Sequence, residues 1–162
     1  MTGDGAGDLH PLKPTEPFVH RRQISWGDTD TARIVYTARI PHFAMEAIEA
    51  WFVDRVGTGF YDLATEHRLG TPFVHIELDF RSPMTPRDRI ATTVLLERMG
   101  RSSLTFGLTS HAEAEGRLCW SGRFICVYTN PETYKSVEVP ERFRDALRSE
   151  VDLFRSLGRP GS

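Results

Sequence analysis

The sequence predicts an α+β domain in which one long buried helix packs against a curved antiparallel sheet. Three observations predict this fold class. Apolar residues recur at helical spacing after a first strand-like segment, alternating segments follow from residue 71, and short Gly-containing turns separate those segments. Such turns join antiparallel neighbours. An open sheet also has edge strands that need covering, so a dimer is expected.

The first half of the chain predicts one strand followed by the helix. Residues 18–26 alternate, and one face carries Phe18, His20, Arg22, Ile24 and Trp26. Residues 37–57 then carry apolar side chains over most of a helix circumference, which predicts a buried helix. Pro41 fits best at its first position, with Ile40 outside the helix, and Gly57 or Gly59 suits its end.

The second half predicts further strands and a terminal helix. The strands are expected over 71–83, 88–99, 102–114 and 117–129, and the helix over 140–157. We expect residues 1–16, rich in Gly, Pro and Asp, to form a disordered tail. Residues 17–157 then form a single domain, and residues 158–162 a flexible C-terminus.

Composition excludes several classes of function. A net charge of −2 over 162 residues gives no general basic field for nucleic acid. No apolar run approaches a membrane span, and no signal peptide is evident. Cys119 and Cys126 fit no zinc spacing and are expected to be buried thiols, which favours a cytoplasmic location. The histidines form no ligand cluster, and nucleotide-binding and metalloprotease motifs are absent, so no metal site is expected.

The segment GDTD places Asp28 and Asp30 directly after the first strand. One interpretation is an Asx turn, in which the acids bind backbone N–H groups. A calcium loop is excluded, because residues 31–34 supply no further acid and include Arg33. The third interpretation makes one Asp a catalytic carboxylate near a helix start, whose N–H groups would stabilise an oxyanion.

The segment RRQISWGDTDTARIVYTARIPHFAMEAIEAWF resembles the opening of the 4-hydroxybenzoyl-CoA thioesterase family, which has a hotdog fold. Shared features are a strand, G-D-x-D, a hydrophobic-Val-aromatic step and a long apolar helix. GTPFVHIELDFRSPMTPRDRI and ERMGRSSLTF resemble later family segments, so the likeness runs from about Phe18 to Thr129. It implies an acyl-CoA thioesterase that uses no metal or other cofactor, since coenzyme A is part of the substrate. It also implies a homodimer or homotetramer with sites at the dimer interface.

The resemblance assigns roles to individual residues. Asp30 falls at the family's catalytic carboxylate, which attacks the thioester carbonyl or activates water. Thr37 falls where a backbone amide holds the thioester oxygen, which requires an irregular helical turn before Pro41. The implied substrate- or CoA-binding residues are Tyr36, Thr71, Arg101, Ser102 and Ser103. Arginine pairs phosphates bidentately, although an exposed hairpin charge explains Arg101 equally well.

Two departures from the family concern the pocket. Arg33 stands where the family usually has glycine, and Ile40 stands where tyrosine is common. Arg33 could narrow the pocket, pair with Asp28 or hold an anionic group. We expect Asp28 to be structural, bonded to backbone N–H groups or to Arg33.

The acyl group is expected to be aromatic, of benzoyl type, with short or medium aliphatic chains as the next choice. Two other functions stay open. A hotdog acyl-CoA dehydratase or hydratase would need a histidine beside the acid, and His42 lies on the helix without the matching motif. A non-catalytic acyl-CoA-binding protein could use the same fold.

Overall fold

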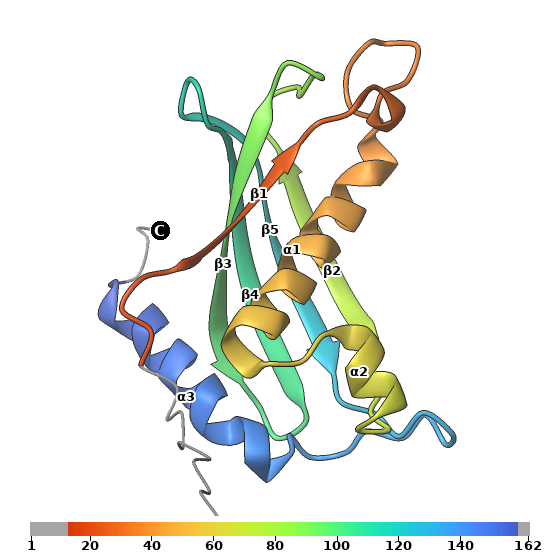
Figure 1. The fold of residues 1–162 in the computed structure, drawn as a ribbon, viewed down its shortest axis with the longest axis vertical. Helices are drawn as coiled ribbons and strands as arrows, with labels where there is room; N and C mark the ends of the chain where they lie inside the picture. The colour runs from red at the N-terminus through yellow and green to blue at the C-terminus, as the bar shows by residue number, and fades with distance from the viewer. Residues whose placement is uncertain (1–12, 159–162) are drawn as a thin grey trace, which may run out of the picture.

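A five-stranded antiparallel sheet curves around the long helix α1 (Figure 1). The structure is a computed structural model and describes residues 13–158. The strands are β1 Phe18–Gln23, β2 Phe73–Phe80, β3 Arg89–Met99, β4 Ser103–Ala112 and β5 Arg117–Val127. The helices are α1 Ile40–Val56, α2 Phe60–Thr65 and α3 Glu141–Ser156. Most of the predicted tail over 1–16 and of the C-terminal segment 158–162 lies outside the described residues, so those two predictions stay open.

The strands are ordered β1-β3-β4-β5-β2. Strands β3, β4 and β5 form a meander through tight turns at Gly100 and Gly116, as the sequence predicts. Strand β1 pairs with the outer edge of β3, and β2 pairs with β5 rather than with its neighbour in sequence. Every pairing is antiparallel. The predicted α+β hotdog arrangement is therefore confirmed, with β2 as one edge strand.

The core lies between α1 and the concave face of the sheet. Trp51 of α1 makes edge-on aromatic contacts with Phe52 at 5.2 Å and with Phe106 of β4 at 5.1 Å between ring centroids. All three rings are completely buried. Burying a side chain of this size stabilises the fold by about 1.5–3 kcal/mol. The helix is buried on most of its circumference, as its sequence pattern predicts.

The entry into α1 differs by one residue from the prediction. The helix begins at Ile40, so Pro41 occupies its second position, where a missing N–H still costs no helical bond. A 3-10 turn, Thr37–Arg39, precedes it and supplies the irregular first turn that the role expected of Thr37 requires. The helix ends at Gly57, whose φ of 83° is left-handed, as expected for a glycine C-cap.

Strand β1 is shorter than predicted. It ends at Gln23, and Trp26 lies in a 3-10 turn, Trp26–Asp28, with 86% of its surface exposed. A capping box between Ser25 and Asp28 closes this turn and breaks the alternation of the strand. The short helix α2 was not predicted, because six residues are too few to establish a helical period.

Helix α3 packs its apolar face against β3 and α1, as its spacing predicts. Trp51 Nε1 donates a hydrogen bond of 3.3 Å to Glu150 Oε2, and Arg55 Nε lies 3.4 Å from Glu150 Oε1. Burial raises the pKa of Glu150, and the nearby Arg55 offsets only part of that effect. None of the described helices has the length and apolarity needed to cross a membrane.

Candidate active site

Asp30 lies in a tight hairpin loop. Thr29 and Val35 form an isolated antiparallel bridge, and Arg33 N donates to Asp30 O at 3.0 Å. The Asp30 side chain is exposed, and its Oδ1 accepts a hydrogen bond of 2.9 Å from Ala32 N. Asp30 therefore does form an Asx turn, the structural alternative for these acids. A carboxylate has two oxygens with about four acceptor sites, so this bond orients Asp30 and leaves acceptor capacity for a ligand.

Arg33 occupies the left-handed position of the same loop, with φ of 63°. Glycine adopts this conformation at little cost, whereas a residue with a Cβ atom pays about 1 kcal/mol. This conformation gives a physical reason for glycine at the corresponding position of the family that the sequence resembles. The departure at Arg33 therefore places a long cationic side chain on a strained backbone beside Asp30.

Asp28 is a buried structural acid. Its Oδ2 accepts hydrogen bonds from Ser25 N at 2.9 Å and Ser25 Oγ at 3.0 Å. Arg22 Nη2 donates to both carboxylate oxygens at 3.1 Å, and Arg39 Nη2 donates to Oδ1 at 3.0 Å. The predicted bond to a backbone N–H is confirmed. The alternative partner, Arg33, is not found, because Arg22 and Arg39 hold the carboxylate instead.

These bonds set the ionisation of Asp28. Burial on its own would raise the pKa, but the bonds from Ser25 and Arg39 and the charge of Arg22 lower the pKa of Asp28 to about 2. The carboxylate is therefore ionised at neutral pH. Its backbone oxygen also accepts from Tyr36 N at 2.9 Å, so Asp28 fixes both sides of the loop that carries Asp30.

The network continues onto α1. Arg22 Nη1 donates to Glu46 Oε2 at 2.8 Å, and His20 Nε2 lies 3.0 Å from Glu46 Oε1. The Arg22 guanidinium also stacks on the Phe43 ring, 4.4 Å from its centroid. Burial opposes ionisation of Glu46, yet its bonds to His20 and Arg22 lower its pKa. Strand β1, the acidic loop and the central helix are thus joined by charge-assisted contacts.

Thr37 begins the 3-10 turn before α1 and lines a cavity. The amide of the preceding residue, Tyr36, is used by its bond to Asp28 O. Thr37 N–H is the first donor of a helical turn, and among the described residues no backbone carbonyl outside that turn accepts from it. The structure therefore places a backbone donor and the Asp30 loop on one short segment.

The cavity has a volume of about 420 Å³. Three segments enclose it: the Asp30 hairpin, the start of α1, and the residues where β2 ends and the next loop begins. The lining residues are Ile34, Val35, Thr37, Ile40, Phe80, Arg81, Ser82, Pro83 and Met84. The volume and the apolar lining with a few polar groups are typical of a small-molecule site.

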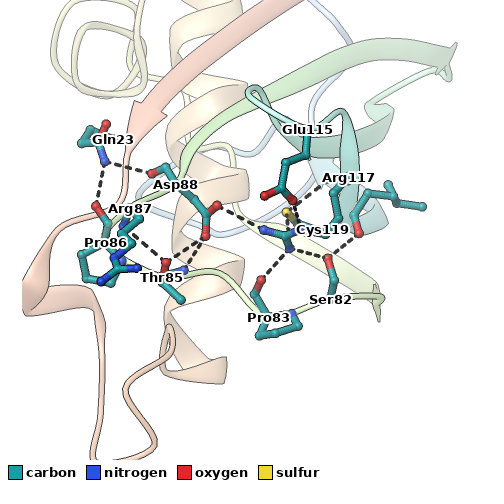
Figure 2. A network of polar contacts seen from close by, with 11 residues as sticks. Gln23, Ser82, Pro83, Thr85, Pro86, Arg87, Asp88, Glu115, Arg117 and Cys119 are labelled. Carbon is teal, nitrogen blue, oxygen red and sulfur yellow. Dashed lines mark hydrogen bonds and ion pairs between the residues drawn. The ribbon is translucent and has the colours of Figure 1, made fainter.

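Arg117 fixes the wall that follows β2 (Figure 2). Its Nη1 donates to Ser82 Oγ at 2.8 Å and to Pro83 O at 2.7 Å, and its Nη2 donates to Asp88 Oδ1 at 3.1 Å. Ser82 Oγ in turn donates to Leu118 O at 2.6 Å. The wall is joined to the hairpin by Val35 N, which donates to Met84 O at 2.9 Å. The cavity is thus built on a rigid frame.

Sequence reasoning missed this wall. Ser82 and Pro83 appear in the sequence only as the end of a strand, and Arg117 as the start of another. These residues meet because β2 pairs with β5 in the sheet, although β3 and β4 lie between them in the sequence. The exposure of Phe80 and the edge position of β2 mark this surface, but both are properties of the fold rather than of the local sequence.

The remaining predicted residues lie at the other end of the sheet (Figure 1). Thr71 is half-buried two residues before β2 starts, so it precedes the strand on which it was expected. Arg101, Ser102 and Ser103 lie at the turn between β3 and β4, where Arg101 Nε donates to the exposed Glu138 at 2.9 Å. The Phe80 end of β2 is roughly 23 Å from the Phe73 end, at 3.3 Å per residue. One chain therefore does not bring these residues together with Asp30 and Thr37.

Comparison with known proteins agrees with this fold. The family model of the thioesterase-like superfamily matches residues 24–147. A 1,4-dihydroxy-2-naphthoyl-CoA hydrolase of Picosynechococcus is 36% identical over 73 residues, which are 45% of this chain and 49% of that protein. The hydrolase of the same name from Synechococcus elongatus is 26% identical over 136 residues, covering 83% of this chain and 98% of that one.

A solved structure extends the likeness to almost the whole domain. The thioesterase superfamily protein from Jannaschia superposes with a TM-score of 0.78 and 37% sequence identity, covering 88% of this chain and 99% of that one. The Picosynechococcus hydrolase is matched over only about half of its length, whereas the Jannaschia protein is matched along nearly all of its chain. The chain therefore belongs to the thioesterase-like superfamily.

Proposed function

We propose that this protein hydrolyses acyl-CoA thioesters, with Asp30 as the catalytic carboxylate. The observation that carries the proposal is one short segment that bears both Asp30 and the Thr37 amide, with Thr37 lining an apolar cavity. Thioester hydrolysis needs a carboxylate, an oxyanion donor and a positioned water. Membership of the thioesterase-like superfamily supports the same reaction.

In the simplest form of the reaction, Asp30 takes a proton from water as the oxygen of that water adds to the thioester carbonyl. The carbonyl oxygen becomes an oxyanion and accepts a hydrogen bond from Thr37 N–H. The intermediate then expels the sulfur of CoA as a thiolate, which recovers a proton, and leaves the free acid. Direct attack by Asp30 would give an anhydride first, which water then hydrolyses.

The complete site requires two chains in this proposal. Strand β2 is an edge of the sheet and exposes Val74, Ile76 and Phe80, while Tyr36 and Trp26 are exposed on the neighbouring loop. An antiparallel pairing of two β2 edges about a twofold axis would cover this surface. It would also bring the Thr71 end of one chain to the Asp30 end of the other. Arg101, Ser102 and Ser103 would then serve CoA, and Tyr36 would contact substrate near Asp30.

An aromatic acyl group is the favoured substrate. Two relatives are named 1,4-dihydroxy-2-naphthoyl-CoA hydrolases, and the cavity has the size and apolar lining that an aromatic ring requires. The narrower assignment to the 4-hydroxybenzoyl-CoA thioesterase family, with a benzoyl-type acyl group, stays a proposal. The same holds for a cofactor-free reaction, since the proposed steps use only residues of the chain and water.

The test is the release of free thiol from a panel of aromatic and aliphatic acyl-CoA thioesters. The wild-type protein is compared with Asp30→Asn, which keeps the side-chain shape and removes the base. Asp145→Asn, at an exposed position on α3, is the matched control. We expect turnover by the wild type and the control and a loss of at least about 100-fold in Asp30→Asn. Binding without turnover of any thioester would instead identify an acyl-CoA-binding protein.

A further inference from the structure

We propose that Arg81 selects acyl groups that carry a negatively charged substituent, such as a carboxylate on an aromatic ring. This inference rests on the proposed thioesterase function and names the substrate class of the same cavity. Among the described residues that line the cavity, Arg81 alone carries a charge. The other lining residues are apolar apart from Thr37 and Ser82.

Three carboxylates near the cavity are already paired with other arginines. Asp88 and Glu115 both bind Arg117, at 3.1 Å and 3.0 Å. Asp28 binds Arg22 and Arg39. Within residues 13–158, no carboxylate forms an ion pair with Arg81, so its charge is not neutralised by the chain. A ligand anion is therefore the natural partner for this guanidinium.

Ser82, the polar neighbour of Arg81, is not free to take that role. Its hydroxyl donates to Leu118 O at 2.6 Å. It accepts from Arg117 Nη1 at 2.8 Å (Figure 2). A hydroxyl has one donor, so Ser82 has none left for a substrate anion. Its bonds instead hold the wall in place. Thr37 and Arg81 are then the described lining residues with unused donors, and only Arg81 is charged.

The backbone at Arg81 is held in position. Arg81 N donates to Cys119 O at 2.8 Å, and Ser82 N donates to the same oxygen at 3.1 Å. Cys119 is itself buried in β5. A binding group on a fixed backbone loses less conformational freedom when it binds, which increases its contribution to affinity. The backbone that carries Arg81 is therefore fixed, and this exposed arginine stands at the edge of an otherwise apolar cavity.

An anion on the acyl group and the phosphates of CoA are both compatible with arginine chemistry. The position of Arg81 favours the acyl group, because it shares the cavity with Thr37, where the thioester carbonyl is proposed to lie. The CoA phosphates are assigned to Arg101, Ser102 and Ser103, which in the proposed dimer come from the other chain and supply a basic side chain of their own. The experiment must nevertheless separate the two anions.

The probes are benzoyl-CoA, 4-carboxybenzoyl-CoA and the pantetheine thioesters of the same two acids, which lack the nucleotide phosphates. We expect the wild type to prefer the carboxylated substrate in kcat/KM, and Arg81→Gln to lose about ten-fold or more on that substrate alone. The loss should be the same in the pantetheine series. Arg81→Lys should recover part of it. Arg87→Gln, at an exposed arginine outside the cavity lining, should leave kcat/KM unchanged for both substrates.

Two results would overturn the inference. An equal loss on both CoA substrates that disappears with pantetheine would assign Arg81 to the phosphates, and no loss on any substrate would remove its role. Calorimetric binding of both CoA thioesters to Asp30→Asn, with and without Arg81→Gln, gives a readout that does not need turnover. If the wild type hydrolyses no thioester of the aromatic and aliphatic panel, the proposed function fails, while selective binding of the carboxylated probe still supports Arg81.

Discussion

Asp28 joins the acidic loop to the start of the central helix, because its carboxylate accepts a hydrogen bond of 3.0 Å from Arg39. Arg22 of β1 holds the same carboxylate. Asp30, two residues later, has a side-chain bond only to the Ala32 amide within the described residues. The two acids thus have different surroundings: Asp28 is buried and saturated with donors, whereas Asp30 is exposed and can reach a ligand. This difference explains how one short motif can serve both structure and chemistry.

Replacing Asp28 with Asn should destabilise the protein by about 2–3 kcal/mol at pH 7. The pKa of Asp28 is about 2 when folded and 3.8 in the reference state, and each unit corresponds to about 1.4 kcal/mol. Because the folded pKa is the lower one, this stabilisation is present above pH 4 and is lost as the pH falls towards 2. Urea unfolding at pH 7, 5, 4 and 3 measures it.

The difference between wild type and Asp28→Asn should therefore shrink steadily below pH 4. Asp145→Asn, whose carboxylate is exposed and pairs with Arg148 across one helical turn, should change stability by less than about 0.5 kcal/mol. A difference for Asp28→Asn that stays constant from pH 7 to 3 would show that its effect is not electrostatic.

Replacing Arg33 with Gly should stabilise the fold by about 0.5–1 kcal/mol. The φ of 63° is strained for arginine and relaxed for glycine, although glycine also raises the entropy of the unfolded chain. Arg87→Gly is the matched control, since among the described residues Arg87 is not one of those with positive φ. It should be destabilising. Chemical denaturation of both variants measures the sign, and a loss of stability in Arg33→Gly would contradict the account of this loop.

Glu150 should tolerate glutamine better than leucine. Burial raises the pKa of Glu150, so its charge is costly, while its oxygen is needed as acceptor for Trp51 Nε1. Glutamine keeps an acceptor and removes the charge, so Glu150→Gln should change stability by less than about 1 kcal/mol at pH 7. Glu150→Leu leaves the indole N–H unpaired and should cost about 1–3 kcal/mol more. Equal melting temperatures of Glu150→Gln and Glu150→Leu would contradict the role of this hydrogen bond.

Lysine at Ile76 should dissociate the proposed dimer. Ile76 lies in the edge strand β2 and is partly exposed, and charged residues on an edge prevent strand pairing. Sedimentation velocity should show a smaller species for Ile76→Lys, with unchanged circular dichroism and lost turnover. Tyr134→Lys, at another exposed apolar position, should leave the assembly unchanged. A wild-type protein that sediments as a monomer would contradict the two-chain site.

Much of the fold is predictable because its signals are local. The spacing of Phe43, Ala47 and Trp51 indicates the buried helix, and the glycines at 100 and 116 indicate the hairpins. The predicted end of β1 was wrong because the Ser25–Asp28 capping box ends the strand, although the alternation of residue types continues in the sequence to Trp26. The pairing of β2 with β5 follows from topology, which no local pattern contains.

Only the Asp30–Thr37 segment of the candidate site could be predicted from the sequence. Asp30 and Thr37 lie on one continuous segment, so a motif can show them. The wall around Arg81 and Ser82 is assembled by Arg117 from a strand far along the chain, and the left-handed backbone of Arg33 has no signature in its residue type. The cytoplasmic location and the oligomeric state remain predictions.

Complementation between two inactive chains tests the central claim most directly. Asp30→Asn removes the proposed carboxylate, and Arg101→Glu repels CoA at the opposite end of the sheet. Each variant alone should be nearly inactive. In a mixed dimer, purified through two different tags, one site carries both defects and the other carries neither, so up to about half of the wild-type activity should return. Mixed dimers as inactive as their parents would contradict a site that takes Asp30 from one chain and Arg101 from the other.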